Sequence, residues 1–181
     1  MARILMTGGA GFIGTNLVHY WLREQPRDFI VVLDALTYAG RIGNLEPAMT
    51  RATFRFVHGN ICDTPLVEAL LRDHAIDTIV HLAAESHVDR SITGPDPFIE
   101  ANIIGTHSML KAARRVWLEE RRTSTHRFHH VSTDEVYGSL GPNDAAFTET
   151  TPYAPNSPYS ASKAASDHLV RAYHHTYGLA T

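Results

Sequence analysis

A glycine-rich turn near the N-terminus, residues 7–14 (TGGAGFIG), constrains the fold more than any other feature of the sequence. It spaces Gly8, Gly11 and Gly14 three residues apart, between an apolar run over residues 3–7 and a helical pattern. Such a turn lets the backbone approach a pyrophosphate, while the helix N-terminus offers N–H donors and positive potential. The same glycines could also serve only the tight packing of a strand against a helix. The turn therefore predicts a strand–helix unit in which the glycines serve either to bind a pyrophosphate or only to allow tight packing.

An acidic residue after the second apolar run favours the binding purpose. Residues 29–34 read as a strand that ends at Asp34, about 20 residues beyond Gly14. A carboxylate at this place can accept hydrogen bonds from a ribose diol and repels a 2′-phosphate. We therefore interpret the two motifs together as a site for NAD rather than NADP.

The rest of the chain repeats the alternation of strands and helices. Further strands are predicted over residues 53–58, 78–82 and 127–132, and long helices over residues 97–121 and 159–177. Nearly continuous apolar strands indicate a parallel sheet that is covered on both faces. Right-handed crossovers then leave a doubly wound α/β sheet of the Rossmann type as the simplest topology.

Length and composition suit one globular domain. The chain has 181 residues, a formal charge of −3, 44% hydrophobic residues and 19% charged residues. We expect residues 1–181 to form one NAD-binding domain that is incomplete at its C-terminal end, because another strand is due after Thr181. The charge lacks the basic field of a nucleic-acid binder, and no apolar run approaches the length of a membrane span. The single cysteine, Cys62, excludes an internal disulfide and fits a cytoplasmic location.

A second group of motifs carries catalytic chemistry. Tyr159 and Lys163 lie four residues apart in a predicted helix, and a lysine ammonium beside a phenol lowers the pKa of the phenol. Thr133 follows a strand at the edge where such sheets bind ligands, and it can hydrogen-bond the oxygen that Tyr159 deprotonates. Repulsion between the adjacent carboxyls of Asp134 and Glu135 separates their pKa values, so that one can act as acid and the other as base. The alternative for this pair is a solvated loop in which Asp134 caps a turn.

The twelve histidines do not predict a metal site. His129 and His130 are adjacent on a strand and therefore face opposite sides. His174 and His175 lie near a helix end, where they suit the helix dipole. None of the histidines shows the spacing of a structural metal site, so we expect no bound metal.

Together these motifs resemble the extended short-chain dehydrogenase/reductase family and, within it, the dTDP-glucose 4,6-dehydratases. The glycine and Tyr/Lys motifs are shared by the whole superfamily, whereas residues 85–91 (ESHVDRS) and 133–135 (TDE) are more specific to the dehydratases. The similarity covers nearly all of this chain but only the N-terminal part of the family's fold. The segments that carry the resemblance are residues 7–14, 34–40, 81–91, 132–138 and 157–163.

The resemblance implies a hydro-lyase with tightly bound NAD that converts a nucleotide-glucose, such as dTDP-glucose, to a 4-keto-6-deoxy sugar. Tyr159 would take the proton of the sugar 4-hydroxyl, Thr133 would position that oxygen, and Lys163 would hold the nicotinamide ribose. Glu135 would then remove the C5 proton, and Asp134 would release the C6 hydroxyl as water before hydride returns to C6. Such a reaction belongs to nucleotide-sugar metabolism and deoxysugar biosynthesis.

The resemblance also implies binding residues and a homodimer formed through residues 97–121 and 159–177. Asn60 departs from the family pattern, which usually has an aspartate there to read the adenine. The implied cofactor-binding residues are Gly8, Gly11, Phe12, Ile13, Gly14, Asp34, Leu36, Thr37, Gly40, Asn60, Ile61, Leu82, Ala83, Ala84, Tyr159 and Lys163. The implied substrate-binding residues are Ser86, His87, Thr133, Asp134 and Glu135.

Two other functions stay open at this point. A nucleotide-sugar 4-epimerase uses the same Tyr/Lys pair and NAD but has no elimination step, so it does not need Asp134 and Glu135. A truncated, non-catalytic dinucleotide-binding module would fit the end at Thr181, but the intact Thr/Tyr/Lys set argues against it. If the natural chain ends at Thr181, we expect weak NAD binding and negligible turnover. The sequence does not settle whether the sugar carries dTDP, UDP or GDP.

Overall fold

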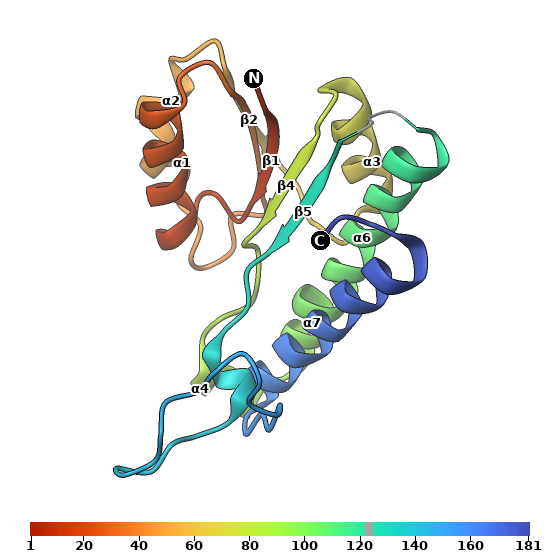
Figure 1. The fold of residues 1–181 in the computed structure, drawn as a ribbon. Coiled ribbons are helices and arrows are strands. Elements are labelled where there is room, and N and C mark those ends of the chain that lie inside the picture. The colour runs from red at the N-terminus through yellow and green to blue at the C-terminus, as the bar shows by residue number, and fades with distance from the viewer. Residues whose placement is uncertain (122–124) are drawn as a thin grey trace.

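The computed structural model describes residues 1–121 and 125–181. Within them, five parallel strands form one sheet in the order β3-β2-β1-β4-β5 (Figure 1). The order reverses beside β1, so the carboxyl ends of β1 and β4 flank a topological switch point, where such sheets bind ligands. The doubly wound sheet predicted from the sequence is confirmed. The strands are β1 (Arg3–Thr7), β2 (Phe29–Asp34), β3 (Phe54–His58), β4 (Thr78–His81) and β5 (Arg127–His130).

The strand register aligns the carboxyl ends along one edge of the sheet. Thr7 pairs with Leu33 on one side and with His81 on the other. Asp34 pairs with His58 one strand further out. Residues that follow each strand therefore meet at the same edge, next to the switch point.

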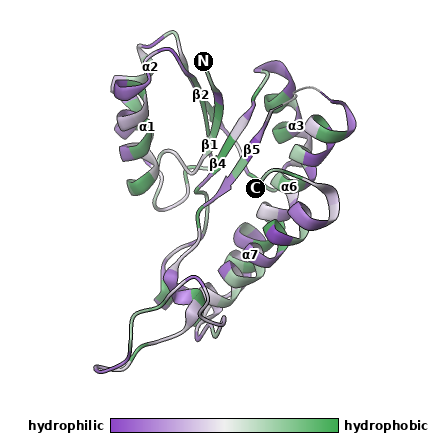
Figure 2. Cartoon of the chain, in the orientation of Figure 1, coloured by the Kyte–Doolittle hydropathy of each residue, from purple (hydrophilic) through white to green (hydrophobic). Residues whose placement is uncertain are grey.

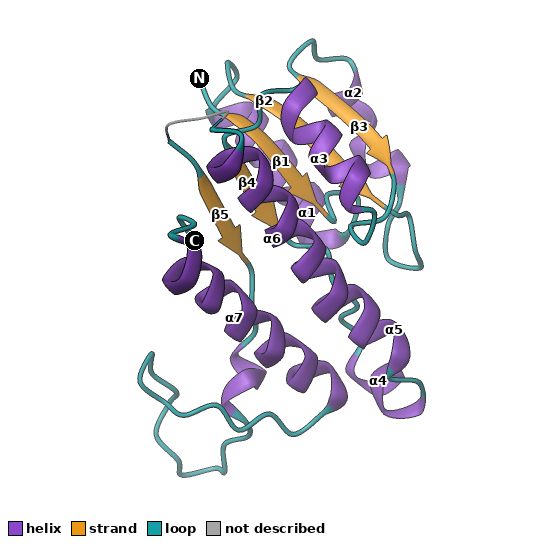
Figure 3. Cartoon of the chain, turned by 90° about the vertical axis from the view of Figure 1, so that its right-hand side faces the viewer, coloured by secondary structure: helices purple, strands orange, loops and turns teal. Residues whose placement is uncertain are grey.

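Helices cover both faces of the sheet. α1 (Phe12–Glu24) and α2 (Glu46–Met49) lie on one face, and α3 (Thr64–Asp73), α6 (Thr106–Ala113) and α7 (Pro158–Tyr177) lie on the other (Figures 1 and 3). This arrangement gives the molecule three layers, with the site edge of the sheet left open between the helix layers.

Alternation along the central strands builds a separate hydrophobic core on each face. Ile4 and Met6 join Val18 of α1 in one core, while Leu5 joins Met109 of α6 in the other. Burial of each such side chain is worth about 1.5–3 kcal/mol. Figure 2 shows the same preference, with hydrophobic colour concentrated on β1 and β2.

The two long predicted helices are present. A continuous helix over residues 96–119 comprises α5 (Asp96–Phe98), α6 and two π-helical stretches, η2 (Ile99–Gly105) and η3 (Arg114–Glu119), and so ends slightly before the predicted limit. α7 begins one residue earlier than predicted, because Pro158 is tolerated in a first turn.

Local signals fix both ends of α7. Ser157 and Ser160 form a capping box, in which the Ser157 hydroxyl accepts from the Ser160 N–H at 3.0 Å. Gly178 ends the helix in the left-handed conformation, with φ +73°. The beginning and end of the helix that carries Tyr159 and Lys163 are therefore set by residues next to it in sequence.

Several short elements were not predicted. Each has only four to six residues, which are too few to show a helical period. They are η1 (Ile42–Leu45), α2, α4 (Val88–Thr93) and the 3₁₀ turn η4 (Asp134–Tyr137).

Within residues 1–121 and 125–181, no helix combines the length and the apolar character needed to cross a membrane. Over the same residues, no three His, Cys, Asp or Glu side chains gather closely enough to hold a metal ion. His129 and His130 face opposite sides of β5 as predicted, since His129 is exposed while the His130 side chain is buried.

Candidate active site

A cleft of about 560 Å3 opens at the carboxyl edge of the sheet, over the switch point between β1 and β4. Its volume lies within the range of about 300–1,000 Å3 that is usual for small-molecule sites. The glycine turn, the segments after β2, β3 and β4, and the first turns of α7 form its walls. The predicted site residues that line it are Gly8, Gly11, Phe12, Ile13, Gly14, Asp34, Thr37, Gly40, Asn60, Ile61, Leu82, Ala83, Ala84, Ser86, Tyr159 and Lys163.

The three glycines of the turn occupy their positions for different physical reasons. Gly8 has φ +71°, and a Cβ there would lie 2.7 Å from the Ala83 nitrogen. A Cβ on Gly14 would lie 2.2 Å from the Gly8 oxygen, so Gly14 permits α1 to pack close to β1. A Cβ on Gly11 would meet nothing closer than 3.4 Å, which is ordinary contact. Packing thus explains Gly8 and Gly14 but leaves Gly11 unexplained, as expected of a position kept bare for a ligand.

The N-terminus of α1 is suited to an anion. Gly11 is its N-cap residue and supplies no side-chain cap. The next two residues, Phe12 and Ile13, line the cleft and are 84% and 66% exposed. The first N–H groups of the helix therefore have no side-chain acceptor from the N-cap residue, and the helix dipole favours a negative group beside them.

Asp34 fastens the glycine turn to the loop after β2. One carboxylate oxygen accepts from the Ala10 N–H at 2.9 Å, and the other accepts from the Leu36 N–H at 2.8 Å. Each oxygen can still accept a further hydrogen bond from a ribose hydroxyl. The Leu36 side chain, which was predicted to bind the cofactor, does not line the cleft. It packs instead against the hydrophobic core on the α1 face.

Of the five predicted catalytic residues, Tyr159 and Lys163 line the cleft, whereas Thr133, Asp134 and Glu135 are not part of its wall and act on the Tyr159 phenol from η4 and its cap. Tyr159 and Lys163 are buried, one turn apart on α7, and both line the cleft. Burial raises the pKa of Tyr159, a hydrogen bond from Thr133 lowers it, and the charges of Glu135 and Asp134 raise it further. Glu135 is half-buried and Asp134 is exposed. A phenol with two carboxyls beside it can exchange protons with a substrate at more than one atom.

The balance of charge around the phenol differs from the sequence prediction. We expected Lys163 to lower the pKa of Tyr159, but burial and the two carboxylates outweigh any such effect, and the pKa is raised. The Lys163 ammonium instead donates to the Val131 carbonyl at 2.7 Å. Burial lowers the pKa of Lys163 to about 8.

The turn that carries the two carboxyls is capped by Thr133. Its side-chain oxygen accepts from the Glu135 N–H at 3.3 Å and so begins η4. The alternative in which Asp134 caps a turn therefore does not describe this segment. Asp134 is free of the capping role, and its charge acts on the phenol of Tyr159.

The two residues predicted after β4 lie differently. Ser86 lines the cleft, whereas His87 is exposed, precedes α4 and is not part of the cleft wall. His87 is the N-cap residue of α4, and this position suits a role in ordering the loop better than a role in binding a ligand.

Sequence reasoning missed the polar contacts that hold this segment. The buried Asn102 side chain accepts from the Glu85 N–H at 2.8 Å, donates to the Glu85 carbonyl at 2.9 Å and donates to Ser162 at 2.8 Å. These bonds tie the segment after β4 to α7. Glu85 lines the cleft, and burial raises its pKa. The available signal was an amide at a buried position of the helix predicted over residues 97–121.

Comparison with known proteins agrees with this geometry. The family model described as GDP-mannose 4,6 dehydratase matches residues 5–181. The dTDP-glucose 4,6-dehydratase of Xanthomonas campestris pv. campestris (strain B100) is 58% identical over 99% of this chain and 51% of its own length. The chain thus spans about half the length of this relative.

Solved structures extend the comparison. The dTDP-glucose 4,6-dehydratase of Streptomyces venezuelae, with NAD and TYD bound, is 50% identical with a TM-score of 0.88, covering 98% of this chain and 53% of that one. The UDP-glucose 4-epimerase of Thermus thermophilus, in complex with NAD, is 32% identical with a TM-score of 0.83, covering 98% of this chain and 52% of that one.

Proposed function

Because the chain belongs to the GDP-mannose 4,6 dehydratase family, we propose that it supplies the NAD-binding and catalytic residues of a nucleotide-sugar 4,6-dehydratase, a hydro-lyase. The observation that carries the proposal is a buried phenol on which the Thr133 hydroxyl and the charges of Glu135 and Asp134 act, at one end of a cleft of about 560 Å3. The choice of dTDP-glucose is supported by the relative that is 58% identical. The proposal includes a cytoplasmic location, supported by the free thiol of Cys62.

NAD fits the cleft on the chemistry of its walls. Gly11 leaves room for a pyrophosphate beside the uncapped N-terminus of α1, and Asp34 has acceptor capacity for a ribose diol. Lys163 would move from the Val131 carbonyl to the nicotinamide ribose. When bound, NAD would accept hydride from C4 of the sugar and later return it to C6.

The first role of the chain's own residues is to remove the proton of the 4-hydroxyl. Tyr159 would accept this proton on its phenolate oxygen, and the hydroxyl of Thr133 would hold the sugar oxygen beside it. The raised pKa of Tyr159 disfavours the phenolate, so positive charge brought into the cleft would have to lower this pKa before Tyr159 accepts the proton. The product of this step is a 4-ketone.

The second role is elimination of water. The ketone acidifies the C5 proton, which Glu135 would remove. The electron pair of the C5–H bond becomes the C5–C6 double bond as the C6–O bond breaks, and Asp134 would give its proton to the departing hydroxyl, which leaves as water. After hydride reaches C6, Glu135 would return a proton to C5. The product is the 4-keto-6-deoxy sugar.

Glu135→Gln tests the elimination directly. We expect product formation to fall by about 10²–10⁴-fold, the usual worth of a general base, while absorbance of reduced cofactor still develops. Glu149→Gln, which changes an exposed glutamate in the loop before α7, is the matched control and should act like the unsubstituted protein. Undiminished dehydration by Glu135→Gln would overturn this assignment.

The 4-epimerase is the weaker alternative, since its structure is 32% identical and the dehydratase structure is 50% identical. An epimerase would not need Asp134 or Glu135, so its rate would survive both Asp134→Asn and Glu135→Gln. Assays with dTDP-, UDP- and GDP-glucose, scored for either a 4-keto-6-deoxy sugar or a C4 epimer, separate the two activities and identify the nucleotide.

The proposal also includes a homodimer built on the helix over residues 96–119 and on α7, which lie side by side (Figure 3). Large apolar side chains on these helices face solvent: Ile99 is 45% exposed, Ile104 is 52% exposed and Tyr177 is 42% exposed. Ile104→Glu should convert a dimer to a monomer in light scattering. A monomeric unsubstituted protein would refute the dimer.

A further inference from the structure

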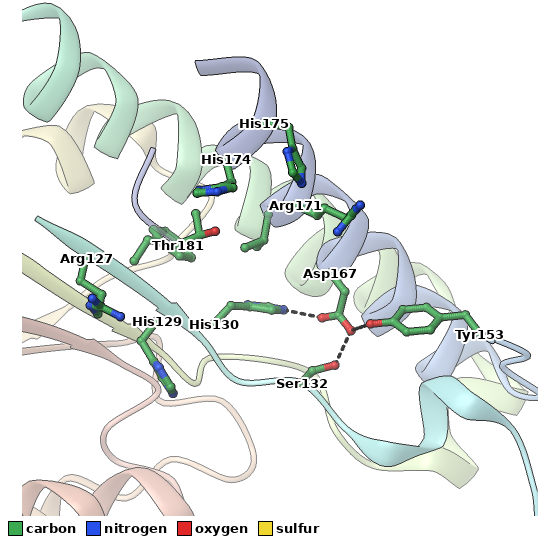
Figure 4. Close-up of a pocket in the computed structure, with 12 residues that line it drawn as sticks. Arg127, His129, His130, Ser132, Tyr153, Asp167, Arg171, His174, His175 and Thr181 are labelled. Carbon is green, nitrogen blue, oxygen red and sulfur yellow. Dashed lines mark hydrogen bonds and ion pairs between the residues drawn. The ribbon is translucent and has the colours of Figure 1, made fainter. Parts of the chain in front are cut away.

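One carboxylate on α7 collects donors from two different segments. Oδ2 of Asp167 accepts from the Ser132 hydroxyl at 2.5 Å and from the Tyr153 hydroxyl at 2.9 Å (Figure 4). Nε2 of His130 lies 3.1 Å from Oδ1. The side chains of Asp167 and His130 are only 12% and 8% exposed. Of these four residues only Ser132 also lines the cleft, and no step proposed above uses any of them.

The carboxylate of Asp167 keeps its negative charge. Burial acts to raise the pKa of Asp167, but hydrogen bonds from His130, Ser132 and Tyr153 outweigh it and hold the pKa below its ordinary value. An ionised carboxylate only accepts, so both hydroxyls donate and their directions are fixed. Charge-assisted bonds of this kind are about twice as strong as neutral ones.

Both segments lead to the two ends of η4. Ser132 immediately precedes Thr133, which caps the turn. The ring of Tyr153 lies edge-on to the ring of Tyr137, the last residue of η4, with centroids 5.3 Å apart. The turn that carries the two carboxyls is thus connected at its beginning and at its end to the single side chain of Asp167.

The helix position of Asp167 completes the connection. It lies one turn beyond Lys163 and two turns beyond Tyr159 on the same rigid helix. We propose that Asp167 is a positioning residue that holds η4, and with it Asp134 and Glu135, at the distance from Tyr159 that the elimination step requires. This inference rests on the proposed function, because it assigns the contacts of Asp167 to one of its two steps.

The inference predicts a separation of the two steps. A misplacement of about 1 Å can cost on the order of 100-fold in rate. Asp167→Asn keeps the size of the side chain but removes its negative charge and replaces one oxygen by an NH2 donor. The two hydroxyls, which share Oδ2, then either lose their acceptor or keep it without charge assistance. We expect product formation to fall about 10- to 100-fold. C4 oxidation uses Tyr159, Lys163 and the capping residue Thr133, and the charge of Asp167 raises the pKa of the first two. We therefore expect C4 oxidation to fall less than elimination, so that reduced cofactor accumulates.

Asp28→Asn is the matched control. Asp28 accepts from the Ala2 N–H at 2.7 Å and from the Trp21 indole at 3.1 Å, at the opposite edge of the sheet. Asp28→Asn also removes a carboxylate that accepts from two donors, so it should lower the free energy of unfolding by a similar amount. Both reaction steps should keep their rates. Tyr153→Phe removes one donor alone and should show a smaller effect of the same kind, which also covers the case in which Asp167→Asn does not fold.

Amide hydrogen exchange gives a readout that needs no turnover. Asp167→Asn should speed exchange over residues 132–138 and leave residues 8–14 unchanged. Equal loss of both reaction steps, full product formation, or unchanged exchange over residues 132–138 would overturn the inference. Absence of dehydration by the unsubstituted natural protein that contains residues 1–181, assayed with NAD, would overturn the proposed function instead, and the exchange measurement would still decide whether Asp167 holds η4.

Discussion

The Thr7 hydroxyl lies 2.7 Å from Nδ1 of His81 and joins the carboxyl ends of β1 and β4 at the switch point. The same hydroxyl oxygen accepts from the Ala83 N–H at 3.1 Å. Nε2 of His81 lies 3.0 Å from the Thr106 hydroxyl, so both ring nitrogens have a hydroxyl partner. Burial lowers the pKa of His81 well below its ordinary value, so the ring is neutral. This chain of bonds holds Ala83, which lines the cleft.

Thr7→Val should destabilise the fold strongly. The substitution keeps the shape of the side chain but leaves the His81 ring nitrogen and the Ala83 N–H without partners. Each buried unsatisfied group costs about 1–3 kcal/mol, so we expect the free energy of unfolding to fall by about 2–5 kcal/mol in denaturant titrations. Thr50→Val, which removes an exposed bond to the Pro47 carbonyl, should stay within about 0.5 kcal/mol. Similar losses in both variants would show that the buried chain of bonds is not special.

Gly11→Ala and Gly14→Ala separate ligand binding from packing. Gly11→Ala adds a Cβ that clashes with nothing in the protein, so the free energy of unfolding should stay within about 0.5 kcal/mol, while NAD affinity in calorimetry falls at least about tenfold. Gly14→Ala forces a Cβ against the Gly8 oxygen and should cost about 1–3 kcal/mol of stability. Unchanged NAD affinity in Gly11→Ala would mean that the turn serves packing alone.

Asp34→Ala should change the choice of cofactor. Loss of a charged hydrogen bond to a ribose hydroxyl costs about 1.5–3 kcal/mol, which corresponds to about 10- to 100-fold in NAD affinity. Loss of the negative charge removes the repulsion of a 2′-phosphate, so the ratio of NAD to NADP affinity should fall as well. An unchanged ratio would show that Asp34 only fastens the turn.

Lys163 predicts a specific pH dependence of stability. Its pKa is about 8 in the folded protein and 10.5 as the ordinary value, so the unfolded chain binds more protons between these limits. Stability therefore rises with pH in this window, by about 2 kcal/mol between about pH 7.5 and 9.5. Denaturant titrations of the unsubstituted protein and of Lys163→Met should show this slope only in the former. Parallel pH profiles would contradict the buried ammonium.

The sequence predicted the strands well at their beginnings and less well at their ends. β1 and β2 match their predicted limits, because their apolar runs stop where the glycine turn and Asp34 begin. β4 and β5 end earlier than predicted, although Leu82 and Val131 are apolar, because these residues turn away to line the cleft. Hydrophobicity cannot distinguish a residue in the sheet from a residue in the wall of a site.

Local pattern found the residues that share a helix or a turn and missed those that depend on distant contacts. Tyr159 and Lys163 are one turn apart, so their shared face follows from spacing alone. Asp167 continues the same face, but its partners Ser132 and Tyr153 lie 35 and 14 residues away in sequence. No local rule links them, and only the tertiary fold brings the three residues together.

The two hydrogen bonds that Asp34 accepts from backbone N–H groups have a consequence for the affinity of the cleft for a dinucleotide. Ordering a backbone residue costs about 1–2 kcal/mol of conformational entropy, and a ligand that must order a loop loses that much from its net binding energy. Because the Ala10 and Leu36 N–H groups already donate to Asp34, the glycine turn and the loop after β2 are ordered before a ligand binds. A dinucleotide that binds therefore loses no binding free energy to ordering this loop, which favours slow dissociation and a long residence time.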